Sequence, residues 1–194
     1  MTLYIWRHPK PLAATGICLG HTDMGVDKRK LKRLANQIQR FARRHQLLKV
    51  IWVSPLKRSL KVGQILAQHG FQCHISSELA EIDFGVWDGC PWETIAKQEI
   101  DKWCDDFAHF APDNGESLQQ LFVRVEGWLN ERIAEQGGIS INMPILVVGH
   151  AGWINAAKMI DAGQDVPRVA ADWRRSVAYG ERSTLRFQDF DWIR

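Results

Sequence analysis

Two arginines and two histidines of this sequence follow short apolar runs that are typical of buried strands. Arg7 and His8 end the first run, Arg58 follows the second run by a few residues, and His150 comes shortly after the third. The carboxyl ends of parallel strands meet at one edge of an open α/β sheet, where ligands bind. We therefore expect these four side chains to converge on one site.

These side-chain types suit the hydrolysis of a phosphomonoester, whose dianion offers several acceptor oxygens. Arg7 and Arg58 would bind the phosphate through forked hydrogen bonds, and His150 would donate one further bond. A neutral imidazole nitrogen of His8 could then attack phosphorus and form a phosphohistidine that water hydrolyses. Because these groups can carry the charge of the transition state, the prediction includes neither a metal nor a cofactor.

The elements that must place these residues alternate between strands and helices. We expect strands over 3–7, 50–54, 72–76, 145–149 and 183–187. We expect helices over 27–46, 56–69, 118–136 and 152–162. The third of these helices should start after the N-cap Ser117 and end at the glycine pair 137–138. This alternation predicts an α/β three-layer sandwich, in which helices cover both faces of a mostly parallel sheet. The segment 77–116 interrupts the alternation, and we interpret it as a partial lid, because long irregular stretches in compact domains are usually functional.

Four motifs in this order resemble those of a known family. They are an Arg-His pair at 7–8, S-P-L-x-R at 54–58, L-x-E-x-x-x-G-x-W-x-G at 79–89 and G-H-x-G at 149–152. Together they make the chain similar, over nearly its whole length, to the histidine phosphatase superfamily, also called phosphoglycerate mutase-like. The resemblance implies the sandwich fold and a metal-independent phosphatase whose partner is a small phosphomonoester.

The resemblance also implies a general acid. In the third motif the family's acid falls on Glu81, whereas Glu78 is the nearby alternative. Glu81 is expected to donate a proton to the leaving oxygen and then to act as a base. Burial beside apolar side chains would raise the pKa of this carboxyl, and the neighbouring cations would lower it. The sequence leaves open which of the two effects is larger.

Residues 16–23 resemble the loop on the phosphate side of the family's site, where backbone N–H groups face the ligand. Gly20 would allow a close approach of that ligand. His21 and Thr22 are candidates for substrate binding, with a position on a surface loop as the alternative. Trp87 is a candidate for the wall of the substrate pocket, and core packing is the alternative for any one of the nine tryptophans.

Two positions depart from the family pattern. Pro9 stands where glycine commonly follows the Arg-His pair and has no N–H to offer a phosphate, and Ala14 replaces an asparagine that contacts phosphate in many members.

The G-x-C-x-G-x-x-D loop at 16–23 is similar to that of the α-ribazole phosphatase branch. This branch implies α-ribazole 5′-phosphate, a precursor of cobalamin, as the substrate. A phosphoglycerate mutase-type isomerase and a non-catalytic module that binds a phosphorylated ligand are the alternatives.

Composition bounds the remaining classes. The chain has 194 residues, of which 45% are hydrophobic and 24% charged, and this predicts a single domain over 1–194. A net charge of +3 is too small to indicate nucleic-acid binding, and no apolar stretch approaches the ~20 residues of a membrane span. The four cysteines lack C-x-x-C spacing and the first strand begins at once, so we expect a cytoplasmic protein with reduced thiols. The oligomeric state stays open, with a homodimer as one option.

Overall fold

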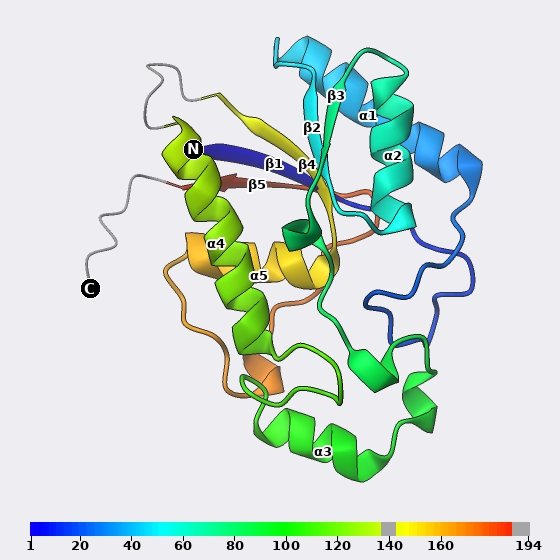
Figure 1. Ribbon diagram of the computed structural model, residues 1–194, viewed down its shortest axis with the longest axis vertical. Helices are drawn as coiled ribbons and strands as arrows, with labels where there is room; N and C mark the ends of the chain where they lie inside the picture. Colours follow the sequence, from blue (N-terminus) through cyan, green and yellow to red (C-terminus); the bar gives the residue numbers. More distant parts are fainter. Residues whose placement is uncertain (137–142, 188–194) are drawn as a thin grey trace.

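The computed structural model describes residues 1–136 and 143–187, and a five-stranded sheet lies at its centre. The strands are β1 (Thr2–Arg7), β2 (Val50–Val53), β3 (Gln72–Ile75), β4 (Ile145–Gly149) and β5 (Arg182–Arg186), in the order β3-β2-β4-β1-β5 (Figure 1). All neighbouring strands run parallel except β5, which pairs antiparallel with β1 at the edge. The predicted mostly parallel sheet is confirmed.

The position of β4 between β1 and β2 brings three strand ends together. Arg7 is the register partner of Gly149, and Val53 is the partner of Val148. The residues that follow these three strands therefore emerge side by side at one edge of the sheet, as the sequence predicts.

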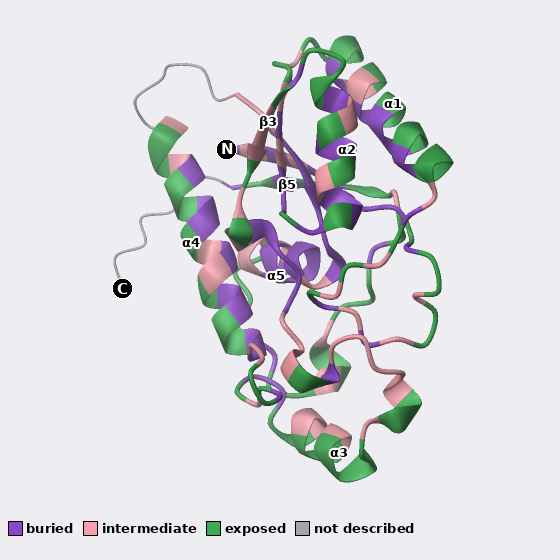
Figure 2. Ribbon diagram, turned by 45° about the vertical axis from the view of Figure 1, so that its right-hand side comes forward, coloured by how far each residue is buried: buried purple, intermediate pink, exposed green. Residues whose placement is uncertain are grey.

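Two helices cover each face of the sheet. α1 (Lys28–Arg44) and α2 (Lys57–Ala67) lie on one face, and α4 (Leu118–Gln136) and α5 (Ala151–Asp161) lie on the other (Figure 1). α1 shows how the sequence produces this arrangement, because its lysines and arginines face solvent while an apolar stripe faces the sheet (Figure 2). The buried residues of that stripe are Leu31, Leu34, Ala35, Ile38 and Ala42. The predicted α/β three-layer sandwich is confirmed.

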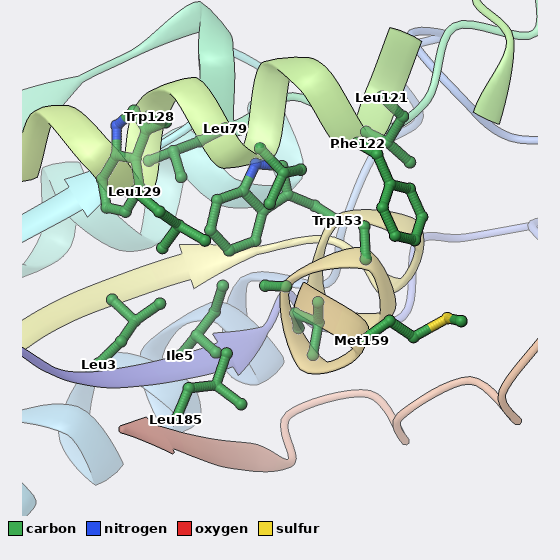
Figure 3. Packing of buried hydrophobic residues seen from close by; sticks show 14 of the residues in the cluster. Leu3, Ile5, Leu79, Leu121, Phe122, Trp128, Leu129, Trp153, Met159 and Leu185 are labelled. Carbon is green, nitrogen blue, oxygen red and sulfur yellow. The ribbon is translucent and has the colours of Figure 1, made fainter. Parts of the chain in front are cut away.

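A hydrophobic core fills the space between the sheet and helices α4 and α5 (Figure 3). The indole rings of Trp128 on α4 and Trp153 on α5 meet edge to face, with centroids 5.5 Å apart. Leu3 and Ile5 of β1 belong to the same cluster and are fully buried. This packing holds α5, which begins directly after His150, against the sheet.

α4 begins at a capping box. Ser117 Oγ accepts a hydrogen bond from the backbone N–H of Gln120 at 3.2 Å, and Gln120 Oε1 accepts one from the backbone N–H of Ser117 at 2.8 Å. The predicted N-cap is confirmed. The glycine pair at 137–138, which the sequence marks as the end of this helix, lies outside the described residues.

The segment 77–116 contains more regular structure than its sequence indicates. It holds three short 3₁₀ helices and one α-helix, namely η1 (Ser77–Leu79), η2 (Gly85–Trp87), η3 (Trp92–Thr94) and α3 (Lys97–Asp105) (Figure 1). The sequence does not indicate α3 because only Ile100, Trp103 and Cys104 interrupt a polar run, and no residue of this helix is buried (Figure 2). The interpretation of 77–116 as the lid of a single domain stays a prediction.

Between α5 and β5 the chain forms one further 3₁₀ helix, η4 (Ala170–Asp172). Within the two described ranges, no helix combines the length and the apolar character that crossing a membrane requires.

Two helical glycines give a matched test of how closely the helices approach their surroundings. A Cβ on Gly63 of α2 would lie 2.6 Å from Cys73 Sγ and 2.8 Å from Val53 Cγ1, whereas one on Gly127 of α4 would meet nothing within 4 Å. Gly63→Ala should therefore destabilise the fold by about 1–3 kcal/mol through overpacking. Gly127→Ala should stabilise it by about 0.5–1 kcal/mol through helix propensity. Urea denaturation measures both changes, and a gain in stability for Gly63→Ala would contradict the described contact of α2 with the sheet.

Candidate active site

His8 leaves β1 at the sheet edge, where its backbone N–H donates to the carbonyl of Gly149 at 3.0 Å. The residue is 2% exposed, and its Nδ1 lies 2.9 Å from the carbonyl oxygen of Pro9. Because a carbonyl oxygen only accepts hydrogen bonds, this contact assigns the proton of the neutral imidazole to Nδ1. Nε2 then keeps its lone pair, as a nucleophile requires.

Arg58 lies beside Nε2 of His8 and is 1% exposed. Its Nε–H points between the two histidines of the site, 3.2 Å from His8 Nε2 and 3.3 Å from His150 Nδ1. Its Nη1 donates to the carbonyl of Thr22 at 3.0 Å, and its Nη2 donates to the carbonyl of Gly20. None of the ion pairs within the described ranges involves Arg58, so backbone carbonyls solvate this buried cation.

His150 is fully buried at the end of β4, and its ring centroid lies 4.9 Å from that of His8. Its Nδ1 accepts the hydrogen bond from Arg58, and its Nε2 lies 2.6 Å from Ser54 Oγ, so Nε2 is assigned as the donor. Burial, followed by the charge of Arg58, lowers the pKa of both imidazoles well below the ordinary value of 6.5. Both rings are therefore neutral at pH 7.

Arg7 is the cation that faces open space beside His8. Its Nη1 donates to the carbonyl of Val177 at 2.6 Å, and its guanidinium lies 3.7 Å from the centroid of the Tyr179 ring. Arg7, His8 and Tyr179 all line one cavity of about 310 Å³. The loop before β5 thus orients the arginine toward that cavity.

Glu81 also lines this cavity and is 7% exposed. Its two carboxylate oxygens accept hydrogen bonds from the N–H of Gly152 at 2.9 Å and 3.2 Å, and the N–H of Ile82 donates to Oε1 at 3.2 Å. A Cβ on Gly152 would lie 2.5 Å from Glu81 Oε1, so only glycine permits this approach. The alternative carboxylate, Glu78, points to Ser77 Oγ at 3.2 Å and lines a separate surface cleft.

The remainder of the cavity wall is largely aromatic and aliphatic. Among the described residues that line it, Arg7 and Glu81 carry the only charges apart from the titratable His8. Aromatic rings come from the segment 77–116 and from the loop before β5, and they are Phe84, Trp92, Trp103, Phe107, Trp173 and Tyr179. Arg58 and His150 contact His8 but are not among the lining residues. The four predicted strand-end residues are therefore together, with Arg7 and His8 foremost.

The loop 20–22 differs from its prediction. Its backbone N–H groups do not face the cavity but donate to the carboxylate of Asp88, at 3.0 Å from Gly20 and 3.1 Å from Thr22, with His21 as the third donor. A Cβ on Gly20 would collide with the carbonyl of Ile82, so the glycine permits an approach to protein backbone rather than to a ligand. The prediction is corrected because Asp88 occupies the three N–H donors that a phosphate would need.

His21 and Thr22 do not line the cavity. Instead, His21 Nε2 lies 2.8 Å from the carbonyl of Glu81, and its Nδ1 lies 3.4 Å from Asp83 Oδ2. Thr22 contributes its carbonyl to Arg58. The structure therefore places these two residues against the Glu81 backbone and against Arg58, and their contact with a substrate stays a prediction.

Trp87 is likewise absent from the cavity wall. It is 3% exposed, and its ring packs against those of Trp103 and Phe110, with centroids 5.8 Å and 5.6 Å away. The alternative interpretation, core packing, describes its position. Trp103, which does line the cavity, lies in front of it.

Several residues of the site escaped prediction from the sequence. Tyr179 and Trp173 lie in the loop before β5, which contains no motif that marks it. Arg124 and Glu116 contact the backbone around Glu81, although the sequence indicated only a helix cap near residue 116. The aromatic content of 90–114 was the one available signal for the cavity wall.

Comparison with known proteins identifies the family of the chain. The sequence model of the histidine phosphatase superfamily (branch 1) matches residues 3–193. The adenosylcobalamin/α-ribazole phosphatase of Escherichia coli (strain K12) is 27% identical over 162 residues, with 78% of this chain and 74% of that protein covered. Phosphoserine phosphatase 1 of Hydrogenobacter thermophilus is 28% identical over 139 residues, with 68% of this chain and 61% of that protein covered.

Solved structures share the fold. The α-ribazole phosphatase of Shigella flexneri superposes with a TM-score of 0.77 at 25% identity and covers 97% of this chain and 92% of its own. A mycobacterial glucosyl-3-phosphoglycerate phosphatase has a TM-score of 0.76 at 22% identity, with 95% and 89% covered, and this likeness concerns the fold alone. The family match extends over residues 3–193, and the fold of the chain is that of these solved structures. The chain therefore belongs to the histidine phosphatase superfamily, branch 1.

Proposed function

We propose that this phosphoric monoester hydrolase transfers the phosphoryl group of a small phosphomonoester to Nε2 of His8 and from there to water. The observation that carries the proposal is the contact of His8 Nδ1 with the Pro9 carbonyl at 2.9 Å, which assigns the proton to Nδ1 and leaves the lone pair on Nε2. Arg7 lines the same cavity as His8, and Arg58 Nε lies 3.2 Å from Nε2. A buried neutral imidazole with two guanidinium groups beside it suits attack on a phosphate dianion.

The first step forms the Nε2–P bond while the P–O bond to the leaving group breaks. Arg58 Nε–H now donates to His8 Nε2, and a phosphate oxygen can replace that nitrogen as the acceptor, which frees the lone pair. Arg7 would bind further phosphate oxygens from the cavity side. His150 accepts from Arg58 at Nδ1 and donates from Nε2 to Ser54, so it would hold the Arg58 guanidinium in place and would donate to a phosphate oxygen only after a change of tautomer.

Glu81 is proposed to protonate the leaving oxygen in the first step. In the second step water attacks phosphorus, the carboxylate of Glu81 takes a proton from that water, and the N–P bond breaks. Inorganic phosphate leaves, and both neutral His8 and protonated Glu81 are restored. The two N–H groups of Gly152 and Ile82 hold the carboxyl group in place through both steps.

The cavity wall supports a leaving group that is uncharged and partly aromatic. Its six aromatic rings offer stacking surface, and among the described residues that line it Arg7 is the one permanent cation, so none is left to bind an anionic leaving group. We propose α-ribazole 5′-phosphate, a phosphorylated riboside of a planar benzimidazole, as the substrate. Relatives at 27% and 25% identity carry the name adenosylcobalamin/α-ribazole phosphatase, which also supports it.

Other interpretations have less support. A phosphoglycerate mutase-type isomerase would bind a carboxylate-bearing substrate, for which the aromatic wall is unsuited. A non-catalytic module would not need His8, Arg58 and Glu81 arranged for transfer. A cytoplasmic location, the absence of nucleic-acid and membrane partners, and a homodimeric state stay predictions of the sequence.

A panel of phosphomonoesters tests the proposal. We expect α-ribazole 5′-phosphate to have a higher kcat/KM than 3-phosphoglycerate or phosphoserine, because only its leaving group matches the aromatic wall.

Turnover should survive excess EDTA, since side chains are proposed to hold the phosphate. His8→Ala should lose about 10³-fold or more in turnover of every substrate. A preference for phosphoserine, or a loss on chelation that a divalent ion restores, would overturn the corresponding part of the proposal.

The neutral state of His8 has a consequence for stability. Burial lowers the pKa of His8 in the folded protein, so below pH 6.5 the unfolded chain binds a proton that the folded protein does not. The free energy of unfolding should therefore fall as the pH drops below 6.5. His8→Asn keeps an amide that can donate to the Pro9 carbonyl but has no group that titrates in this range. Its free energy of unfolding should therefore fall less over the same pH range. Urea denaturation should show the stability difference between the two proteins changing by up to about 1.4 kcal/mol per pH unit in that range. A difference that does not vary with pH would mean that folding leaves the proton affinity of His8 unaltered.

The acid role of Glu81 predicts a dependence on the leaving group. An alkoxide needs a proton to leave, whereas p-nitrophenolate leaves readily without one. In kcat/KM, which reports the phosphorylation step alone, Glu81→Gln should therefore lose roughly 10²–10⁴-fold more on an alkyl phosphate than on p-nitrophenyl phosphate. Glu78→Gln is the matched control and should show no such difference. Equal losses on both substrates for Glu81→Gln would point to a binding role, and a difference confined to Glu78→Gln would move the acid to that residue.

A further inference from the structure

We propose that Arg124 is a positioning residue that fixes the proton donor Glu81 through the backbone of residues 78–81, a role that rests on the proposed function of Glu81. In the part of the chain that the structure describes, the hydrogen bonds to the Glu81 carboxylate come from backbone N–H groups alone, those of Gly152 and Ile82. Its location therefore depends on where the main chain of its own segment lies. Residues 80–83 belong to neither a helix nor a strand, so no regular backbone hydrogen-bond pattern holds them, and their carbonyls need other donors.

Arg124 of α4 does this with one guanidinium group. Its Nη1 donates to the carbonyls of Glu78 at 2.8 Å and Ala80 at 3.1 Å, and its Nη2 donates to the carbonyl of Glu81 at 3.4 Å. The planar guanidinium thus binds three carbonyl oxygens of one segment through two nitrogens, which the single ammonium nitrogen of a lysine could not do with the same geometry. The segment that ends in the acid is thereby attached to a helix of the core.

Glu116 completes the attachment on the other side. Its carboxylate accepts from Arg124 Nε at 2.8 Å and from Nη2 at 2.7 Å, and the side chains of the pair are only 15% and 17% exposed. The backbone N–H of Glu116 donates to the carbonyl of Asp83 at 2.8 Å, and the N–H of Asp83 donates back to Oε2 at 3.3 Å. The Arg124–Glu116 pair thus contacts the chain both before and after Glu81.

Two further contacts come from other elements. Trp153 Nε1 of α5 donates to the carbonyl of Glu78 at 2.9 Å, and His21 Nε2 lies 2.8 Å from the carbonyl of Glu81. Neither bridges the segment as Arg124 does. Loss of Arg124 should let the backbone around Glu81 shift while His8, Arg7 and Arg58 remain in place, because none of the described hydrogen bonds of Arg124 involves these three residues.

The test compares Arg124→Ala with Arg132→Ala. Arg132 lies on the same helix and is 9% exposed, but it packs against Trp52 and pairs with Glu135, and it has no described contact to 78–83. We measure kcat/KM for an alkyl phosphate and for p-nitrophenyl phosphate on one preparation, since their ratio does not depend on the folded fraction. Arg124→Ala should lower the ratio by about 10–100-fold, as expected for a misplaced catalytic group. Arg132→Ala should leave it unchanged.

Rescue experiments separate positioning from general support of the fold. Arg124 lines a solvent-open surface cleft of about 340 Å³, so millimolar guanidinium can reach the space that Arg124→Ala leaves. Guanidinium should restore the ratio in this variant, while sodium chloride of equal ionic strength should not. Arg124→Lys, which keeps the charge and most of the bulk but not the fork, should fold and give an intermediate ratio.

Glu81→Gln, assayed beside these variants, distinguishes the two possible failures. A lowered ratio in Glu81→Gln with an unchanged ratio in Arg124→Ala, or in Arg124→Lys if the alanine variant does not fold, would overturn the positioning role alone. An unchanged ratio in Glu81→Gln would overturn the acid role of Glu81 itself. A low ratio in Arg124→Ala that guanidinium does not raise would also contradict the positioning role.

Discussion

The Nε–H of Arg58 lies between two imidazoles, 3.2 Å from His8 Nε2 and 3.3 Å from His150 Nδ1, and the rest of the site depends on this buried cation. Burying a charge is costly unless polar groups replace water. Here the carbonyls of Gly20 and Thr22 do so, and they can because Asp88 accepts the N–H groups of the same loop. The segment 77–116, which contains Asp88, therefore supports the proposed phosphate site through Arg58 and also forms part of the cavity wall.

The same cation sets the state of the nucleophile. Its charge adds to the effect of burial and lowers the pKa of His8 and His150, which keeps both rings neutral. The two arginines accordingly have different tasks. Arg58 Nε lies between the two histidines, whereas Arg7 faces the cavity and is oriented by Tyr179 and Val177. The proposed attack and the proposed charge stabilisation would thus come from one compact group at the ends of β1, β2 and β4.

Strand ends could be predicted from the sequence because apolar runs are local and parallel pairing brings their carboxyl ends together. Arg7, His8, Arg58 and His150 meet for that reason. Contacts that join irregular segments could not be predicted, since no periodic pattern records them. Asp88 binds a loop that lies 66 to 68 residues earlier in the chain, and Arg124 reaches backbone carbonyls 43 to 46 residues away. Trp87 illustrates the same limit, because only packing decides which of several neighbouring aromatic rings lines a cavity.

Direct observation of the phosphohistidine tests the central claim most sharply. In Glu81→Gln with p-nitrophenyl phosphate, phosphorylation needs no acid, whereas hydrolysis still needs a base. Stopped-flow absorbance should therefore show a burst of about one p-nitrophenolate per site. Mass spectrometry of the protein quenched in alkali should locate the phosphoryl group on His8. The absence of a burst together with the absence of phosphate on His8, or phosphate on another residue, would contradict the account.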